Sequence, residues 1–213
     1  MAYPIELVDL EHGMTLYIPV QNLLKPMYEE LILEDKTAPF PFWAKIWPAS
    51  KAMSAFLQSE LLWVQNKHVV EIGAGMGTPS FLIAKHAREV IISDYVSEAV
   101  KLIDKNINYL GLQNAKALCL DWNQMDWGLF PTDMTNYTIV LSDINYAPDQ
   151  FEPLLNLIQK FMNQGSTILL ATPQRITAFA FVEAIQPYIK KSVLHTVMEN
   201  DQVVEIRILV LYV

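Results

Sequence analysis

The sequence of 213 residues has a single cysteine, four histidines and no long apolar run. One cysteine excludes an intrachain disulfide, and the apolar surroundings of Cys119 predict an unreactive thiol in the core. The histidines show no metal-ligand spacing, so we expect no metal site. Every apolar run is shorter than the ~18 residues that a membrane-spanning helix needs. We therefore expect no association with membranes.

Basic side chains are also scarce, with 15 Lys and Arg against 23 Asp and Glu and a net charge of −8. Nucleic-acid binding needs clustered Lys and Arg that neutralise phosphates, so we expect no nucleic-acid partner. An acidic surface suits a basic protein as substrate, although charge also serves solubility. The early acidic residues Glu6, Asp9 and Glu11 are unlike a cationic targeting segment, and we expect a cytoplasmic protein.

No repeat or Pro/Gly/Ser-rich linker divides the chain, so we expect one compact domain with a core at 67–213. Strands and helices alternate in this core, which is typical of a doubly wound α/β sheet. Strands are predicted at 67–72, 90–93, 115–120, 137–142 and 166–171, and helices at 78–85, 96–110, 151–162 and 177–188. Strands at 192–198 and 203–212 flank a polar turn and predict an antiparallel hairpin. Five β-α units followed by a hairpin is the order of the Rossmann-like seven-stranded methyltransferase sheet.

Residues 1–66 are predicted to form an N-terminal extension packed on this core. A small hairpin is expected from strands at 6–9 and 15–18. The segment 39–48 is rich in proline and aromatic residues and is expected to be an ordered loop, followed by a helix at 51–64.

A glycine-rich segment, EIGAGMG at 71–77, follows the first core strand and precedes a helix. Glycines allow a tight turn and a close approach of the backbone to a ligand, and a helix N-terminus offers free N–H groups. The dinucleotide fingerprint is G-x-G-x-x-G, whereas Gly73, Gly75 and Gly77 are evenly spaced. With the preceding Glu71, this spacing favours a methyltransferase and fits NAD poorly. A structural turn without a ligand is the alternative.

Two acidic residues follow the next two strands. Asp94, with Tyr95 beside it, ends the second strand, where an acid can accept hydrogen bonds from ribose hydroxyls. Capping of the following helix is a compatible role. Asp121 after the third strand is expected to take an adenine amino group while Trp122 covers the ring. A polar loop with a core-packed tryptophan is the alternative there.

At this point the sequence resembles the seven-β-strand protein-lysine methyltransferases, often labelled nicotinamide N-methyltransferase-like. Four blocks carry the resemblance: FWAKIWPAS at 42–50, VEIGAGMGTPS at 70–80, LDW at 120–122 and VLSDINY at 140–146. The resemblance implies S-adenosylmethionine as cofactor and S-adenosylhomocysteine as product. The cofactor residues that it implies, together with those argued above, are Trp47, Glu71, Gly73, Gly75, Gly77, Asp94, Tyr95, Asp121, Trp122 and Ser142.

The resemblance also implies that Asp143 and Tyr146 are catalytic residues that border a methyl-acceptor channel. A lysine amine has a pKa of roughly 10.4 and must lose its proton before it attacks. Asp143 is expected to hold the amine and relay the proton to water. Tyr146 and Trp43 are expected to form an aromatic wall that favours a cationic nitrogen.

Two features bear on the acceptor. Asn145 stands where the family often has a hydrophobic or small residue, and we expect it to alter the acceptor pocket; segment 172–175 is only loosely similar to the family's loop. Nucleic-acid N-methyltransferases typically have two prolines in the loop that corresponds to 143–146, and this sequence has neither. The missing prolines argue against that class, and the resemblance implies N-methylation of a protein lysine. Methylation of a small amine and a cofactor-binding scaffold without transfer activity are the alternatives.

Overall fold

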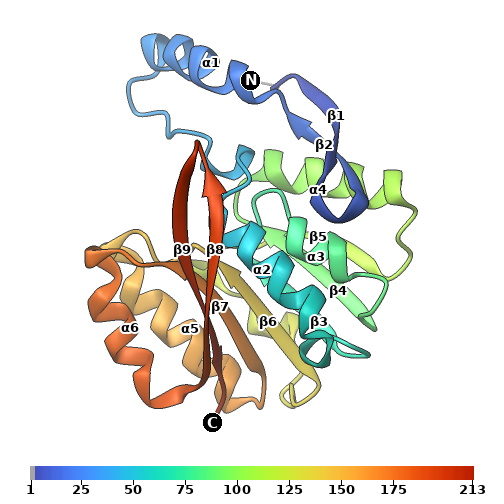
Figure 1. The fold of residues 1–213 in the computed structure, drawn as a ribbon, viewed down its shortest axis with the longest axis vertical. Helices are drawn as coiled ribbons and strands as arrows, with labels where there is room; N and C mark the ends of the chain where they lie inside the picture. Colours follow the sequence, from blue (N-terminus) through green and yellow to red (C-terminus); the bar gives the residue numbers. More distant parts are fainter. Residues whose placement is uncertain (1–2) are drawn as a thin grey trace.

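The computed structural model describes residues 3–213. Its centre is a seven-stranded sheet in the order β5-β4-β3-β6-β7-β9-β8 (Figure 1). The first five strands of this order are parallel, and β9 is antiparallel to both of its neighbours. The strand order reverses between β3 and β6, and ligands of open α/β sheets bind beyond the carboxyl ends of the strands at such a reversal. The predicted fold class is confirmed.

The core strands and helices lie close to their predicted positions. The strands are β3 (His68–Ile72), β4 (Glu89–Asp94), β5 (Ala115–Cys119), β6 (Tyr137–Ser142), β7 (Thr167–Pro173), β8 (Ile189–Glu199) and β9 (Gln202–Leu211). The helices are α2 (Pro48–Ser59), α3 (Thr78–Ile83), α4 (Ser97–Leu110), α5 (Phe151–Asn163) and α6 (Phe179–Ile185). The turn of the C-terminal hairpin consists of Asn200 and Asp201, both with positive φ, as two-residue hairpin turns require.

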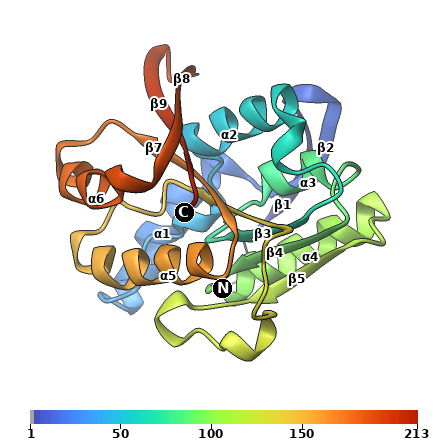
Figure 2. The same ribbon diagram turned by 90° about the horizontal axis from the view of Figure 1, so that it is seen from below.

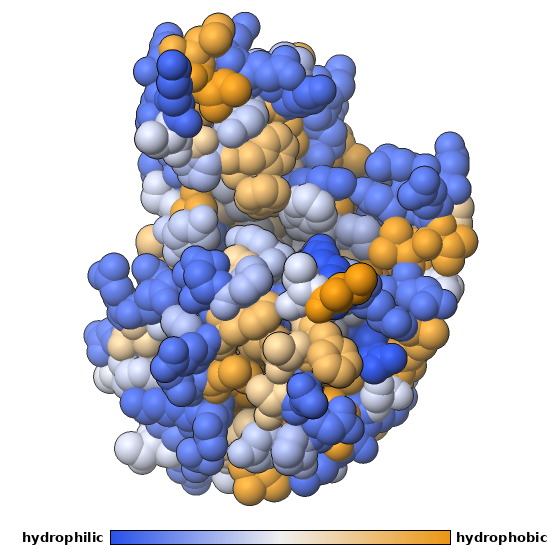
Figure 3. Space-filling view, turned by 90° about the vertical axis from the view of Figure 1, so that its left-hand side faces the viewer, coloured by the Kyte–Doolittle hydropathy of each residue, from blue (hydrophilic) through white to orange (hydrophobic). Residues whose placement is uncertain are grey.

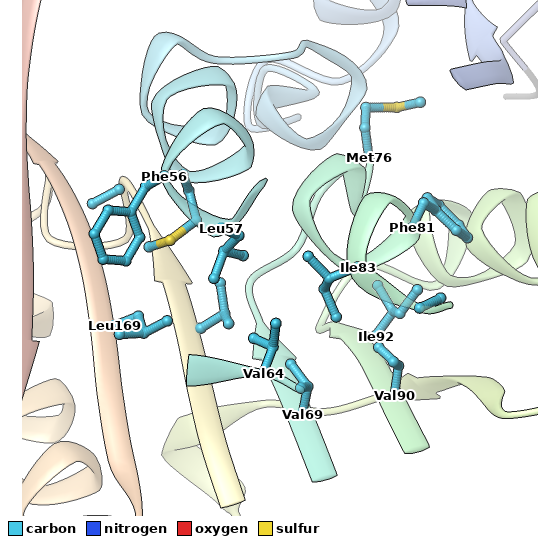
Figure 4. Packing of buried hydrophobic residues seen from close by; sticks show 14 of the residues in the cluster. Phe56, Leu57, Val64, Val69, Met76, Phe81, Ile83, Val90, Ile92 and Leu169 are labelled. Carbon is cyan, nitrogen blue, oxygen red and sulfur yellow. The ribbon is translucent and has the colours of Figure 1, made fainter. Parts of the chain in front are cut away.

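Both faces of the sheet are buried because successive side chains of a strand point to opposite sides. In β3, Val69 belongs to one apolar cluster and Val70 to the other. Helices α2, α3 and α4 cover the first face, and α5 and α6 cover the second (Figures 1 and 2). Figure 4 shows Phe56 of α2 and Ile83 of α3 directed at the strands, one of which carries Val90 of β4. Each face of the sheet is therefore covered by helices and an apolar cluster.

Three predictions about the core are corrected. Within the described residues no α-helix lies between β5 and β6, where five β-α units would place one; 3₁₀ turns at Trp122–Gln124 and Trp127–Leu129 lie there instead, and Phe130 is buried on that face. Cys119 is exposed rather than buried in the core, because β5 is the edge strand and Cys119 is its last residue. The helix predicted at 51–64 is α2, which begins at Pro48, a favoured first helical residue, and ends at Ser59.

The N-terminal part contains the expected hairpin, formed by β1 (Ile5–Leu10) and β2 (Met14–Pro19). The buried side chain of Asn106 on α4 accepts from the backbone N–H of Tyr17 (2.8 Å) and donates to its carbonyl (2.9 Å), which fixes β2 on α4. Helix α1 (Gln21–Glu34) was not predicted, because Pro26 lies in its interior and Leu24 is its one buried residue. Figure 1 shows α1 at the margin of the molecule, away from the sheet. Between Tyr3 and Val213, none of the helices is both long and apolar enough to cross a membrane.

Candidate functional site

A cavity of about 260 Å³ opens beyond the carboxyl ends of β3, β4 and β6, where the strand order reverses. The segment 39–47, here called the aromatic loop, lines its other side. Nine of the twelve predicted site residues line this cavity: Trp47, Gly73, Gly75, Asp94, Tyr95, Trp122, Ser142, Asp143 and Tyr146. The structure brings these residues together from five separate segments of the chain. The other three, Glu71, Gly77 and Asp121, lie outside the lining.

The glycine loop, residues 73–77, packs closely against neighbouring segments. Gly73 and Gly75 both have positive φ, a region that other residues rarely adopt. A Cβ on Gly73 would lie 3.0 Å from Cγ2 of Ile144, and one on Gly75 would lie 3.1 Å from the carbonyl oxygen of Trp43. Side chains at these two positions would therefore crowd the segments that pack against the loop. Gly77 takes the N-cap position of α3 instead of lining the cavity.

Asp94 holds the glycine loop and the start of α4 together. Its carboxylate accepts hydrogen bonds from the backbone N–H groups of Gly75 (2.8 Å) and Val96 (2.9 Å). Burial raises the pKa of Asp94, and these backbone hydrogen bonds oppose that rise. Each carboxylate oxygen has a second lone pair. The side chain therefore has acceptor capacity left for a ligand in the cavity.

The residues after β5 point in different directions. Trp122 lies in the cavity wall against Gly73, and its indole N–H donates to Gln150 (3.2 Å). Asp121 accepts from the backbone N–H of Asn123 (2.9 Å) and caps the 3₁₀ turn. Asp121 is therefore not brought to the cavity beside Trp122, because its short side chain is used in the turn.

Glu71 lies beneath the glycine loop and is 1% exposed. One carboxylate oxygen accepts from the backbone N–H of Ser80 (3.3 Å), and the other has no partner within residues 3–213. Burial raises the pKa of Glu71 to about 7. The buried hydroxyl of Ser142, in the cavity wall, also lacks a partner among the described residues. Unpaired buried polar groups are costly. The hydroxyl of Ser142, which lines the cavity, is therefore a candidate for pairing with a bound ligand.

Asp143 forms an ion pair that the sequence did not predict. Its side chain is 8% exposed, and both carboxylate oxygens contact the guanidinium of Arg175, with Nη2 2.9 Å from Oδ2. Burial raises the pKa of Asp143, and the hydrogen bonds and charge of Arg175 oppose that rise. Asp143 follows β6 and Arg175 follows β7, and these strands are parallel neighbours. The adjacency of β6 and β7 was the signal that could have predicted this ion pair, but the adjacency itself depends on the strand order.

Asn145 does not enter the acceptor side of the cavity as expected. It is buried, and its amide donates to the hydroxyl of Thr172 (3.0 Å). Asn145 therefore ties the segment after β6 to the end of β7, because its side chain points into the structure and not toward the cavity.

Aromatic rings line the side of the cavity at which Tyr146 lies. The ring of Phe42 lies between those of Trp47 and Tyr146, with centroids 6.1 Å from each. Trp43 lines the cavity as well. Phe42 was missed as a site residue, although it lies in the block at 42–50 that carried the resemblance.

The β8–β9 hairpin is connected to this wall. Figure 1 shows its tip projecting beyond the carboxyl edge of the sheet toward the aromatic loop. Glu199 at the tip pairs with Lys45 (2.7 Å) and Lys51 (3.5 Å), and Lys45 lies 4.5 Å from the ring centroid of Trp47. These contacts link a distant hairpin to two side chains of the cavity wall.

We expect Glu199→Gln to weaken binding of S-adenosylhomocysteine by roughly 2- to 30-fold, because a partly exposed ion pair contributes about 0.2–1 kcal/mol and two are lost. Calorimetric titration measures the change. Glu89→Gln is the matched control, since Glu89 also pairs with two basic side chains but at the amino end of β4. Equal affinities for Glu199→Gln and the wild type would show that the hairpin does not support the cavity.

Comparison with known proteins identifies related sequences. A lysine methyltransferase family model matches residues 28–190. Human histone-arginine methyltransferase METTL23 is 27% identical over 130 residues, covering 59% of this chain and 66% of that protein. Mouse EEF1A lysine methyltransferase 3 is 30% identical over 135 residues, covering 62% and 56%. Calmodulin-lysine N-methyltransferase of Arabidopsis thaliana is 28% identical over 165 residues, covering 73% and 52%. The matched part of this chain thus spans less than two thirds of the length of these relatives.

Solved structures share the fold. The N-methyltransferase NodS of Bradyrhizobium japonicum in complex with S-adenosylhomocysteine has a TM-score of 0.60 at 12% identity, covering 85% of this chain and 97% of that one. A putative RNA methyltransferase of Pyrococcus horikoshii has a TM-score of 0.58 at 16% identity, covering 83% and 90%. The family match extends over more than half of the chain and includes the strands and loops that form the cavity. This chain therefore belongs to the lysine methyltransferase family.

Proposed function

We propose that this protein transfers the methyl group of S-adenosylmethionine to a lysine side chain of another protein in the cytoplasm. The observation that supports it most is that one cavity is lined both by the proposed cofactor residues and by the proposed acceptor residues. Asp94, Trp122 and the glycine loop belong to the first group, and Asp143 and Tyr146 to the second. A methyl donor and its acceptor must meet in one such space.

The residues present fit the cofactor. Asp94 would accept from the ribose hydroxyls with its remaining lone pairs, and Trp122 would cover the adenine. The hydroxyl of Ser142 has no partner in the part of the chain that the structure describes, and a ligand with ammonium and hydroxyl groups in the cavity would supply one. Tyr95 and Trp47 complete the wall. When bound, S-adenosylmethionine supplies a methyl group already activated by the adjacent sulfonium.

The chain's own task is then to align the acceptor and keep water away. Orienting a nucleophile in line with the reacting group can contribute several kcal/mol to the rate. Phe42 and Tyr146 offer ring faces on which a cationic nitrogen is stabilised by about 0.5–2 kcal/mol. Asp143 lies beside them as a hydrogen-bond acceptor for the amine. These groups form the proposed acceptor site.

Exposed apolar side chains beside this site favour a protein acceptor over a small amine. Ile176 directly follows Arg175 and is 96% exposed, and Phe179, three residues further along, is 69% exposed. Figure 3, viewed from the side on which α6 lies in Figure 1, shows hydrophobic atoms across the centre of this face. Exposed apolar patches mark protein interaction sites. The names of the relatives point the same way, since they refer to EEF1A, calmodulin and histone as targets.

The test is methyl transfer from tritiated S-adenosylmethionine to EEF1A, calmodulin and histones, followed by hydrolysis and separation of the amino acids. We expect label in methyl-lysine. Label in methyl-arginine would contradict the choice of lysine, and label confined to a small-molecule fraction would favour amine methylation. Binding of S-adenosylhomocysteine with no transfer to any acceptor would favour a scaffold.

We expect Ile176→Asp combined with Phe179→Asp to lower transfer to the labelled protein by about 10-fold, as loss of two apolar contacts of roughly 0.7 kcal/mol each predicts. The affinity for S-adenosylhomocysteine should stay unchanged. Leu62→Asp is the control, because Leu62 is likewise exposed but precedes the amino end of β3. An equal loss of transfer in the control would show that the patch has no special role.

A further inference from the structure

The Asp143–Arg175 pair lies where the proposed acceptor amine would bind, and this inference rests on the proposed function. Both carboxylate oxygens of Asp143 face the guanidinium fork of Arg175. Arginine stays charged at all ordinary pH values, and its planar fork matches a carboxylate. The pair therefore carries no net charge, although an unpaired Asp143 would place a full negative charge at this end of the cavity.

Arg175 is held in this position by its own segment. The neighbouring Gln174 donates to Glu205 of β9 (3.3 Å), and Thr172 accepts from the buried Asn145 (3.0 Å). The side chain of Arg175 is partly exposed while that of Asp143 is buried. The chain that leads into Arg175 is thus anchored at two positions, which places Arg175 beside Asp143 at the end of β7.

The other charged or titratable groups around this end of the cavity do not replace Arg175. They are Tyr3, Lys45, Asp94, Tyr95, Glu98, Tyr146 and Asp149. Lys45 is paired with Glu199, and Asp94 accepts from two backbone N–H groups. Without Arg175, the charge around the acceptor amine would be dominated by carboxylates.

This difference matters for methyl transfer because only a neutral amine has the lone pair that attacks. An ammonium group next to a free carboxylate is stabilised in its charged form and gives up its proton less readily. Next to a neutralised carboxylate that stabilisation is small, while the carboxylate oxygens still have lone pairs to orient the N–H bonds. A neutral pair therefore orients the amine without holding its proton.

We propose that Arg175 is a positioning residue of the acceptor site, which neutralises Asp143 so that the site receives an amine in its reactive, uncharged form. Arg175 does not itself touch the reacting atoms in this role. It acts through Asp143, and its effect is electrostatic.

The experiment uses n-butylammonium as a stand-in for a lysine side chain, titrated against the protein saturated with S-adenosylhomocysteine at pH 7. We expect Arg175→Gln to bind this cation about 10-fold more tightly than the wild type, because a freed carboxylate attracts it. Arg175→Lys, which keeps the charge, should bind it as the wild type does. Asp143→Asn combined with Arg175→Gln restores a neutral pair and should also return the affinity to the wild-type level.

The pH dependence of methyl transfer gives a second readout that a purely structural role would not move. A 10-fold change in cation affinity corresponds to about one pH unit, so in Arg175→Gln the acidic limb of kcat should move up by about one unit. The proposal is overturned if Arg175→Gln lowers kcat without moving the acidic limb of its pH profile. It is also overturned if Arg175→Gln does not bind n-butylammonium more tightly than the wild type. If S-adenosylhomocysteine fails to bind the wild type, the proposed function fails instead, so the two failures are distinct.

Discussion

Replacing Asp94 with alanine is expected to lower the affinity for S-adenosylhomocysteine by at least about 100-fold. Two hydrogen bonds from ribose hydroxyls to a carboxylate are lost, and each contributes roughly 1.5 kcal/mol or more. The same change removes the acceptor that holds Gly75 at 2.8 Å and Val96 at 2.9 Å. The glycine loop and the start of α4 would then lose their connection. Calorimetric titration of the purified variant measures the effect.

Asp126→Ala is the matched control for this variant. Asp126 also accepts from a backbone N–H two residues later, that of Gly128 (2.9 Å), but it does not line the cavity. Its replacement should leave the affinity unchanged. An Asp94→Ala protein that is folded and binds within a few-fold of the wild type would falsify the assignment of Asp94 to the ribose.

In the unliganded wild type, the titration of Glu71 is expected to lower the free energy of unfolding by roughly 3 kcal/mol as the pH rises. Glu71→Gln is expected to abolish this pH dependence. Burial raises the pKa of Glu71 from an ordinary 4.5 to about 7. Between these values the folded state keeps a proton that the unfolded state has lost, so the free energy of unfolding falls as pH rises through this window and is constant above it. A difference of about 2.5 pH units corresponds to roughly 3 kcal/mol.

Urea unfolding at pH 5 and pH 8, for the wild type and Glu71→Gln, measures this difference. The loss of stability between the two pH values should be smaller in the variant. Glu89→Gln serves as control: hydrogen bonding to Lys116 holds the pKa of Glu89 below its ordinary value, although burial opposes this, so its charge is constant over this range. Equal pH dependence in the wild type and Glu71→Gln would mean that Glu71 is already ionised at pH 5.

Most of the sheet could be predicted because its signals are local. Strand β6 was predicted with its observed bounds, and the helix predicted at 96–110 is α4, which begins one residue later. Helix α1 was missed because Pro26 breaks the pattern of a regular helix. The exposure of Cys119 could not be read from its apolar neighbours, because it depends on β5 being an edge strand.

The location of a site residue was predictable where one short segment contains both the residue and the strand end that positions it. The glycine loop and Asp94 each follow a strand end, and the structure places them in one wall. Contacts between distant segments were not predictable. Asp143 and Arg175 are 32 positions apart and meet only because β6 and β7 are neighbours. Glu199 reaches Lys45 only because the hairpin projects beyond the sheet edge. Both contacts depend on tertiary packing that no local pattern encodes.

The crystal structure of this protein with S-adenosylhomocysteine tests the proposed site most directly. We expect the ligand in the cavity at the carboxyl ends of β3, β4 and β6, with ribose hydroxyls on Asp94, adenine against Trp122 and sulfur directed toward Asp143 and Tyr146. Ligand bound elsewhere, such as in the groove between α5 and α6 that Phe151 and Phe181 line, would contradict this placement. So would a protein that binds NAD and not S-adenosylhomocysteine.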